Sequence, residues 1–159
     1  MGEALGLEEL KARLDGFKPS SRKIVLANGH FDVLHVGHLR YLEAAKKHGD
    51  LLVVAINDDS SVARLKGKGR PVVPAVERAE LLAALNPVDF VVVFSGDSPV
   101  DLLQELQPDV HCKGTDYGSP DRVPEYGVVR AYGGATTLVG DPKDHSTTDL
   151  ISKIKNLPD

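Results

Sequence analysis

Short, nearly continuous runs of apolar residues, rich in valine and isoleucine, alternate with helical patterns along most of this chain. Strands buried on both faces have such runs, because helices cover each side of a parallel sheet. The alternation therefore predicts an α/β fold in which a doubly wound, five-stranded parallel sheet carries helices on both faces. The expected strands are Ile24 to Ala27, Leu51 to Ile56, Phe90 to Phe94, Val110 to Lys113 and Ala135 to Val139.

The helices expected between these strands have recognisable ends. Gly49 closes the first, Pro74 opens the second, and Ser98 is placed to cap the third. A further helix before the first strand repeats apolar residues every three or four positions, so it can pack against the sheet edge or a partner subunit. The expected helices are His38 to His48, Pro74 to Leu85, Val100 to Leu106 and, near the N-terminus, Leu7 to Phe17.

Length and composition favour one compact domain. The chain has 159 residues, of which 42% are hydrophobic and 26% charged. This is enough for one buried core and too short for two ordinary domains. We expect a single domain over residues 1–159, in which residues 1–20 form an N-terminal helical extension.

Charge and cysteine content argue against several classes of protein. The formal net charge of −4 provides no general basic surface, which argues against nucleic acid and membranes as partners. Cys112 is the only cysteine, so the chain has neither an internal disulfide nor a cysteine-built zinc site. Because the sequence contains no recognisable signal peptide and no apolar run of membrane-spanning length, we expect a cytoplasmic protein.

Polar residues follow three of the predicted strands, at the edge where a doubly wound sheet binds its ligands. The segment from Asn28 to His38 follows the first strand, Lys113 to Tyr117 follows the fourth, and Gly140 to Ser146 follows the fifth. Because the carboxyl ends of parallel strands lie at one edge, we expect these loops to bring histidine, lysine, aspartate, serine and threonine together.

His35 and His38 are the most informative pair in these loops. Two imidazoles three residues apart lie on the same side of one helical turn. Here the turn begins a helix, where free N–H groups and the helix dipole attract anions, so it is suited to bind phosphate. Taken alone, the pair could equally be metal ligands or ordinary polar residues of a first turn.

Three other features leave a similar choice of interpretation. Ser146 and Asp149 match a capping box, and a helix start capped by hydroxyls also offers amide groups to an anion. The run from Lys66 to Arg70 has three cations separated by glycines, and is either a solvated loop or a mobile arm over a polyphosphate. Lys113, at a strand end, is placed as a point charge for phosphate.

The segment Asn-Gly-His-Phe-Asp-Val-Leu-His-Val-Gly-His-Leu-Arg-Tyr-Leu-Glu-Ala-Ala, from Asn28 to Ala45, resembles the first signature of the cytidylyltransferase-like nucleotidyltransferases. Ser146-Thr147-Thr148 resembles their second. Within that superfamily the chain resembles the heptose 1-phosphate adenylyltransferase branch, also in the helix before the first strand. In many of those relatives the domain is fused behind a sugar kinase, whereas here we expect a stand-alone transferase. The segments that carry this closer resemblance are Leu65 to Val72, Glu77 to Glu80 and Lys113 to Tyr117.

This resemblance implies a Rossmann-like nucleotidylyl transferase fold and transfer of AMP from ATP to a sugar 1-phosphate, foremost heptose 1-phosphate, with release of pyrophosphate. The attacking phosphate is already an anion, so the reaction needs alignment and charge neutralisation but no protein nucleophile. The expected catalytic residues are His35, His38 and Lys113. Mg²⁺ is the expected cofactor, bound mainly through the nucleotide phosphates, and no protein metal site is expected.

The resemblance also implies which residues contact the ligands. The expected partners are ATP and a sugar phosphate, and the expected assembly is a homo-oligomer, foremost a dimer. The expected nucleotide-binding residues are Asn28, Gly29, Phe31, Asp32, His35, Gly37, His38, Lys66, Lys68, Lys113, Asp116, Ser146, Thr147 and Thr148. The expected substrate-binding residues are Arg70, Arg78, Asp116 and Tyr117.

Two positions depart from the relatives. His30 stands where cysteine is common, and the segment Asp141 to His145 lacks an arginine that is typical of the glycerol phosphate cytidylyltransferase branch. Lys143 or His145 is a candidate to supply that positive charge. Two alternatives stay open: a CTP-dependent cytidylyltransferase acting on a small polyol or amino-alcohol phosphate, and a nucleotide-binding module without catalysis.

Overall fold

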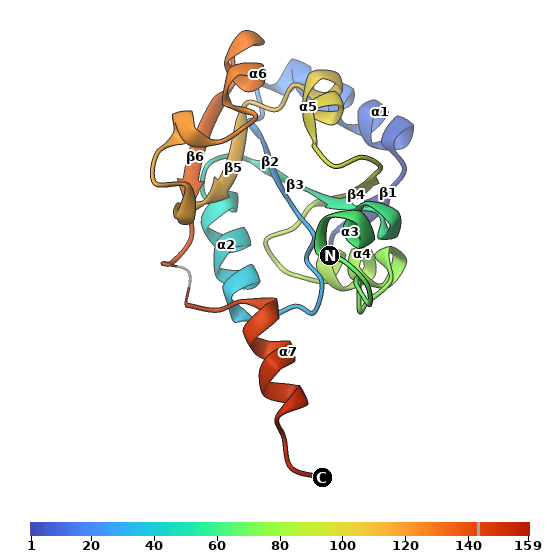
Figure 1. Cartoon of the computed structure of the whole chain (residues 1–159). Coiled ribbons are helices and arrows are strands. Elements are labelled where there is room, and N and C mark those ends of the chain that lie inside the picture. The colour runs from blue at the N-terminus through green and yellow to red at the C-terminus, as the bar shows by residue number, and fades with distance from the viewer. Residues whose placement is uncertain (143) are drawn as a thin grey trace.

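The computed structural model describes residues 1–142 and 144–159, and these residues form one six-stranded parallel sheet (Figure 1). The order of strands across the sheet is β1-β4-β3-β2-β5-β6. This arrangement confirms the predicted doubly wound α/β fold. The strands are β1 (Glu3–Leu5), β2 (Ile24–Gly29), β3 (Leu51–Asn57), β4 (Phe90–Phe94), β5 (Val110–Gly114) and β6 (Ala135–Val139).

The prediction of five strands is wrong by one, because β1 adds a sixth strand at the edge of the sheet. Its three residues pair with β4, from Glu3 opposite Phe90 to Leu5 opposite Val92. The strand has only three residues, is mostly exposed and begins with a glutamate, so it lacks the apolar run that marks the other strands. Arg13, in the following helix α1 (Leu7–Phe17), lies 3.1 Å from the Glu3 carboxylate and ties the two elements together.

The helices lie close to the positions expected from the sequence, and two of them have the predicted bounds. α2 begins earlier than predicted, at Val36, because the side chain of His35 caps it. Pro99, and not Ser98, is the N-cap of α5. Two further helices, α3 and α6, fall in segments for which none is predicted. Besides α1, the helices are α2 (Val36–Lys46), α3 (Asp59–Lys66), α4 (Ala75–Ala83), α5 (Val100–Leu106), α6 (Tyr126–Ala131) and α7 (Thr147–Lys155), with short 3₁₀ turns η1 (Lys18–Ser20), η2 (Thr115–Tyr117) and η3 (Pro120–Arg122).

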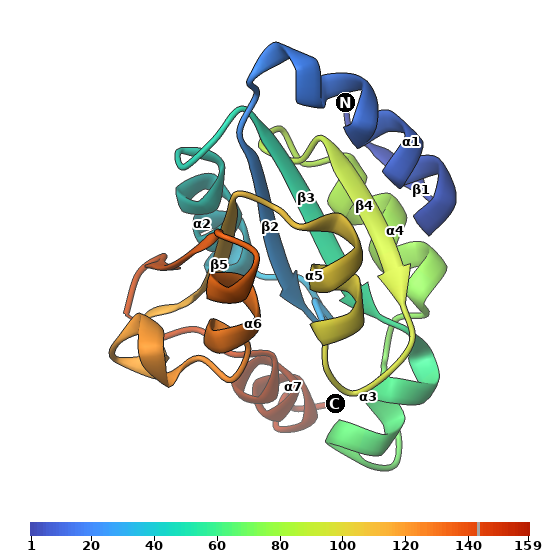
Figure 2. The same cartoon turned by 90° about the horizontal axis from the view of Figure 1, so that it is seen from above.

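Two apolar cores cover the two faces of the sheet (Figure 2). One lies between the sheet and helices α2 and α4, and includes Leu42 and Leu82. The other lies under α1, α5 and α6, and includes Leu10, Leu103 and Val129. Every residue of β3 is buried between these layers, which is why this strand reads as a continuous apolar run.

The strand order reverses at β2, and this reversal creates the edge at which a ligand can bind. From β2 the chain passes through β3 to β4 on one side, whereas β5 and β6 lie on the other side of β2. α7 begins at this edge and projects away from the sheet, with none of its residues buried (Figure 1). Within the described chain, no helix has the length and apolar character needed to cross a membrane.

Candidate functional site

A cavity of about 550 Å³ opens at the carboxyl ends of β2 and β5. The loops after β2, β5 and β6 and the first turns of α2 and α7 contribute to its walls. The cavity brings together nearly all of the site residues predicted from the sequence, and leaves Lys68 and Arg78 outside its lining. The predicted residues that line it are Asn28, Gly29, Phe31, Asp32, His35, Gly37, His38, Lys66, Arg70, Lys113, Asp116, Tyr117, Ser146, Thr147 and Thr148.

His35 and His38 cap α2 with their own rings. The Nδ1 atom of His35 accepts a hydrogen bond from the N–H group of Gly37 at 3.1 Å, and the Nδ1 atom of His38 accepts one from the N–H group of His35 at 3.3 Å. The two rings stack with their centroids 3.8 Å apart. A nitrogen that accepts a hydrogen bond carries no proton, so each neutral ring has its proton on Nε2. The capping bonds thus decide which ring nitrogen can donate to a ligand.

Gly37 makes this ring arrangement possible. A Cβ atom at this position would lie 2.9 Å from Cε1 of His35, closer than real contacts allow, and 3.1 Å from Cβ of His145, which is tighter than most real contacts. Burial, and then the neighbouring His145, lower the pKa of His35, so its ring stays neutral near pH 7. The turn is therefore shaped for two neutral hydrogen-bond donors packed against one another.

Asp32 holds the end of the basic loop against the cavity. Its carboxylate is 1% exposed and accepts hydrogen bonds from Nε of Arg70 at 2.7 Å and from the N–H groups of Val72 and Val73 at 2.9 Å. Burial by itself raises the pKa of Asp32, but these hydrogen bonds outweigh it and hold the pKa below its ordinary value. Asp32 therefore acts as an orienting group for the loop.

The basic loop from Lys66 to Arg70 is placed unevenly around the cavity. Lys66 and the anchored Arg70 line the cavity. Lys68 lies between two glycines with positive φ, is exposed, and is not part of the cavity lining. The loop thus brings its two ends, and not its centre, to the site.

Arg78 is the clearest correction to the predicted site. It is fully buried, and its guanidinium donates hydrogen bonds to the carbonyl oxygens of His30, Asn57 and Val73 and to the carboxylate of Asp59. These bonds tie the loops after β2 and β3 to the start of α4. Contrary to the expectation that it contacts the sugar phosphate, Arg78 is a structural cation beneath the site.

The half-buried His30 lines the cavity among several positive charges. Burial, together with the positive charges of Lys66, Arg78, Arg70 and Lys113, lowers its pKa to about 4. Four cations, from the basic loop, α4 and β5, therefore act on one residue of the cavity lining. Such a field suits a ligand with several negative charges.

α7 closes the cavity through its first turn. The Oγ atom of Ser146 accepts a hydrogen bond from the N–H group of Asp149 at 3.0 Å, which confirms the predicted cap. Oγ1 of Thr147 donates to the carbonyl oxygen of Asp32 at 2.8 Å, so α7 is attached to the loop after β2. His145 stacks on His35 at 6.3 Å between centroids, and Lys143, the other proposed source of positive charge, lies outside the described residues.

The wall formed by the loop after β5 combines a cation with an aromatic ring. Lys113 ends β5, and its Nζ atom lies 5.5 Å from the centroid of the Tyr117 ring. Burial raises the pKa of Tyr117, and the negative charges of Glu125 and Asp116 add to this. Acidic groups therefore lie close to this part of the cavity.

His111 is a residue that the sequence interpretation missed. It is fully buried in β5, and its Nε2 atom lies 2.8 Å from Oδ1 of Asn28, which lines the cavity. Burial lowers the pKa of His111 to about 3, so the ring is neutral and Nε2–H is the donor. The bond fixes the Asn28 amide from below. The presence of a histidine within an otherwise apolar strand was the feature of the sequence that could have indicated this role.

Further cavity residues carried no such signal. Arg40 and Tyr41 lie within the Asn28 to Ala45 signature without an expected role, and the others come from segments that carry no motif, so only the packing of the chain places them at the site. Tyr41 also supports the wall from below, since its hydroxyl donates to the carbonyl oxygen of Cys112 at 2.7 Å. The additional lining residues include Arg40, Tyr41, Asn57, Asp97, Pro99 and Glu125.

The described part of the chain was compared with the arrangement that a protein metal site requires. Within residues 1–142 and 144–159, no three His, Cys, Asp or Glu side chains are arranged to hold a metal ion. The lining combines imidazole, ammonium, guanidinium, hydroxyl and amide groups with six carboxylates, those of Asp32, Asp97, Asp116, Glu125, Asp141 and Asp144. This set fits a cation that arrives already coordinated by phosphate oxygens and water.

Known proteins share both the sequence pattern and the fold. Residues 26–153 match the family described as cytidylyltransferase-like. The chain is 46% identical to the Bifunctional protein HldE of Azotobacter vinelandii over 97% of its length, and 49% identical to that of Geotalea uraniireducens over 94%. It spans about a third of the length of these relatives, 32% and 30% respectively.

Solved structures agree with this assignment of the fold. A lipopolysaccharide core biosynthesis protein from Thermoplasma volcanium superposes with a TM-score of 0.64 at 29% identity, covering 77% of this chain and all of that one. A pantoate-beta-alanine ligase from Francisella tularensis superposes with a TM-score of 0.62 at 15% identity, covering 98% of this chain and 77% of that one. The second likeness concerns the fold alone.

Proposed function

Because the chain belongs to the cytidylyltransferase-like family of nucleotidyltransferases, we propose that it transfers AMP from ATP to a sugar 1-phosphate, foremost heptose 1-phosphate. The products are ADP-heptose and pyrophosphate. The relatives that are 46% and 49% identical, together with the resemblance of the basic loop and of the Lys113 to Tyr117 segment to the heptose branch, support this choice of substrates.

The reaction forms one bond and breaks another at the α-phosphorus of ATP. A phosphate oxygen of the sugar phosphate attacks this atom, and the bond to the oxygen that bridges to the β-phosphorus breaks. Negative charge then grows on the bridging oxygen and on the oxygens around the α-phosphorus. The protein accelerates this step by aligning the two anions and by neutralising that charge.

The capping bonds of His35 and His38 are the observation that carries the proposal. Because both Nδ1 atoms accept from the backbone, both Nε2–H groups can donate to phosphate oxygens in the cavity. The rings need no rearrangement before the reaction, since the helix itself holds them. We expect them to stabilise the α-phosphate and the departing pyrophosphate.

Cations and a helix start act from the other sides of the cavity. Lys113 projects from the end of β5, and Lys66 and Arg70 come from the basic loop, so positive charge surrounds the same point. Ser146 and Thr147 begin α7, where backbone N–H groups favour an anion. We expect this turn to bind the triphosphate tail, with Mg²⁺ entering on the nucleotide.

One assay distinguishes the proposal from its rivals. Pyrophosphate release is measured with ATP or CTP against heptose 1-phosphate, a hexose 1-phosphate, glycerol 3-phosphate and phosphoethanolamine, with His38→Ala as the control for contaminating activity. We expect turnover with ATP and heptose 1-phosphate. Turnover only with CTP and glycerol 3-phosphate would overturn the proposal, and nucleotide binding without pyrophosphate release from any pair would instead indicate a binding module.

A further inference from the structure

Glu125 lines the cavity but is not used by the chemistry described above. It is 7% exposed, and its Oε2 atom is buried without a hydrogen-bond partner among the described residues. The other buried side-chain atoms in the same condition belong to His111, Tyr132 and Thr136, none of which lines the cavity. Glu125 therefore stands apart as an unsatisfied acceptor at the site.

A buried carboxylate oxygen without a partner destabilises the folded chain. Buried polar atoms are nearly always paired, so an exception in a binding cavity indicates a partner that binds there. The backbone of Glu125 is held, because its carbonyl oxygen accepts a hydrogen bond from the N–H group of Val129 at 3.1 Å. The side chain is thus presented from a fixed position at the start of α6.

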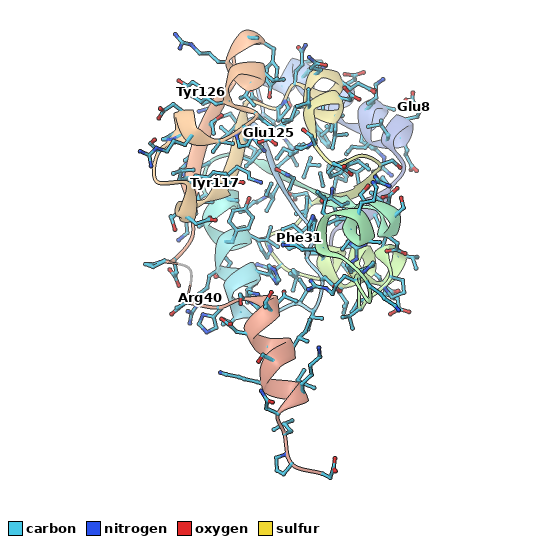
Figure 3. The ribbon with its side chains drawn as sticks, viewed as in Figure 1. Glu8, Phe31, Arg40, Tyr117, Glu125 and Tyr126 are labelled. Atoms are coloured by element: carbon cyan, nitrogen blue, oxygen red, sulfur yellow. The ribbon has the colours of Figure 1, made fainter. Side chains whose placement is uncertain are left out.

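The surroundings of Glu125 indicate which kind of group it binds. Figure 3 shows Glu125 and Tyr117 on the side of the molecule that carries β5, β6 and α6. The negative charges of Glu125 and Asp116 act together on Tyr117, and the Nζ atom of Lys113 lies 5.5 Å from the centroid of the same ring, so this end combines two carboxylates with one cation. The carboxylate of Glu125 can accept a hydrogen bond from a neutral donor but not from a phosphate oxygen that carries no proton.

We propose that Glu125 binds hydroxyl groups of a sugar, accepting hydrogen bonds from one or two adjacent hydroxyls of a ligand whose phosphates lie at the cationic end. The inference rests on the proposed function, because both substrates of that reaction join phosphate to a polyhydroxylated ring. The ribose of ATP and the sugar of the acceptor offer the same chemistry. Glu125 is in this sense a specificity residue and not part of the phosphate machinery.

The test compares ligands with and without a sugar. Dissociation constants are measured by calorimetry for ATP against tripolyphosphate and for heptose 1-phosphate against inorganic phosphate. The proteins are the wild type, Glu125→Gln and the matched control Glu8→Gln. Glu8 lies on α1 at the opposite edge of the molecule, with an 87% exposed side chain (Figure 3).

We expect Glu125→Gln to weaken one of the two sugar-bearing ligands by roughly tenfold to a hundredfold, the range for hydrogen bonds to a charged group. Binding of tripolyphosphate and of inorganic phosphate should be unchanged, and Glu8→Gln should resemble the wild type. The affected ligand identifies the source of the hydroxyls. If ATP is affected, removing a hydroxyl that contacts Glu125 must reduce the difference, so 2′-deoxy-ATP, 3′-deoxy-ATP or both should show a smaller difference between the two proteins than ATP does.

Three outcomes would overturn the inference. The first is that Glu125→Gln binds both sugar-bearing ligands as tightly as the wild type does. The second is that Glu125→Gln loses as much affinity for the sugar-free ions as for the sugar-bearing ligands. The third is that its loss of affinity for ATP is just as large for 2′-deoxy-ATP and for 3′-deoxy-ATP. Because these are equilibrium measurements, they stand even if no pair of substrates releases pyrophosphate and the proposed reaction fails.

A thermal melt separates binding from a structural role. Since Glu125 is unsatisfied in the free protein, Glu125→Gln should leave the Tm of the free chain unchanged or raise it, while reducing the shift that the sugar-bearing ligand produces. A lower Tm in the free protein, with a normal ligand-induced shift, would show that Glu125 is structural.

Discussion

The two ends of the cavity differ in how the protein satisfies their polar side chains. At the α2 end, His35 and His38 bond to the backbone, and Asp32 accepts three hydrogen bonds from the basic loop and its continuation. At the α6 end, Glu125 is buried with one oxygen unpaired. Protein groups orient the polar side chains of the first end in the absence of a ligand, whereas the carboxylate at the second end has one oxygen without a hydrogen-bond partner among the described residues.

This difference indicates that the two ends contribute to different steps, one to the chemical step and the other to binding of the ligand. Donors that are already oriented stabilise charge in a transition state without reorganisation, so substitutions at the α2 end should mainly lower kcat. An acceptor completed by the ligand contributes to ground-state binding, so substitutions at the α6 end should mainly change Kd and KM. Substitutions at each end can therefore show whether the two ends differ in this way.

His38→Ala should have the largest effect. Removing one positioned donor to a developing negative charge typically lowers the rate by roughly 10²-fold to 10³-fold, with a much smaller change in ATP affinity. Steady-state kinetics of pyrophosphate release, together with calorimetric ATP binding, measure both quantities. His48→Ala, the same change at an exposed histidine at the end of α2, is the matched control. Near-normal turnover of a folded His38→Ala protein would refute the proposed role of the turn.

Asp32→Asn should release the basic loop. The amide can no longer accept from Arg70, Val72 and Val73 together, so kcat/KM should fall roughly tenfold to a hundredfold and the free energy of unfolding by about 2–3 kcal/mol. Denaturant titration and kinetics check the two effects. Asp15→Asn, at a 65% exposed carboxylate, is the control. An Asp32→Asn protein with normal stability would mean that the loop is held by other contacts.

The stability effect of Asp32 should also depend on pH. Its pKa is lower in the folded chain than the ordinary value of 3.8, so its stabilisation is complete above that pH and is lost as the pH falls through the folded pKa. The difference in unfolding free energy between wild type and Asp32→Asn should therefore be constant near neutrality and shrink below pH 3.8. A difference that grows on acidification would contradict the assignment.

His111→Leu should raise the KM for ATP by about tenfold, because Asn28 loses the hydrogen bond that orients its amide.

The His111→Leu substitution should also change how the free energy of unfolding depends on pH. The pKa of His111 is about 3 in the folded chain against 6.5 unfolded, so only the unfolded chain binds this proton, and wild-type stability falls as the pH drops from 6.5. The variant should lose less stability between pH 6.5 and 5. Equal slopes, measured beside His48→Leu as a control, would exclude His111 as their source.

Lys68→Ala should have the smallest effect, a roughly threefold loss in kcat/KM. The side chain is exposed and outside the cavity lining, so solvent and salt screen its charge. The loss should disappear as the ionic strength rises, whereas a loss caused by Lys66→Ala at the cavity wall should persist. A larger effect for Lys68 than for Lys66 would mean that the centre of the loop closes onto the ligand.

Much of the phosphate end was accessible from the sequence, because local patterns determine it. Two histidines three residues apart at a helix start, a lysine at a strand end and a serine before a helix each define their own geometry. Arg78 was misassigned for a related reason. Its segment carries the same charges whether the guanidinium faces a ligand or, as the structure has it, the carbonyl oxygens of buried loops.

Apolar periodicity is a local property, so the amino-acid sequence was enough to predict the alternation of buried strands and helices and the edge of the sheet where a ligand binds. The pairing of β1 with the sheet, the place of His111 beneath Asn28 and the unpaired, buried oxygen of Glu125 at the cavity emerged from the folded structure alone. Each of these depends on segments far apart in the chain. Burial and hydrogen-bond satisfaction are set by such packing, and a run of residue types does not encode them locally.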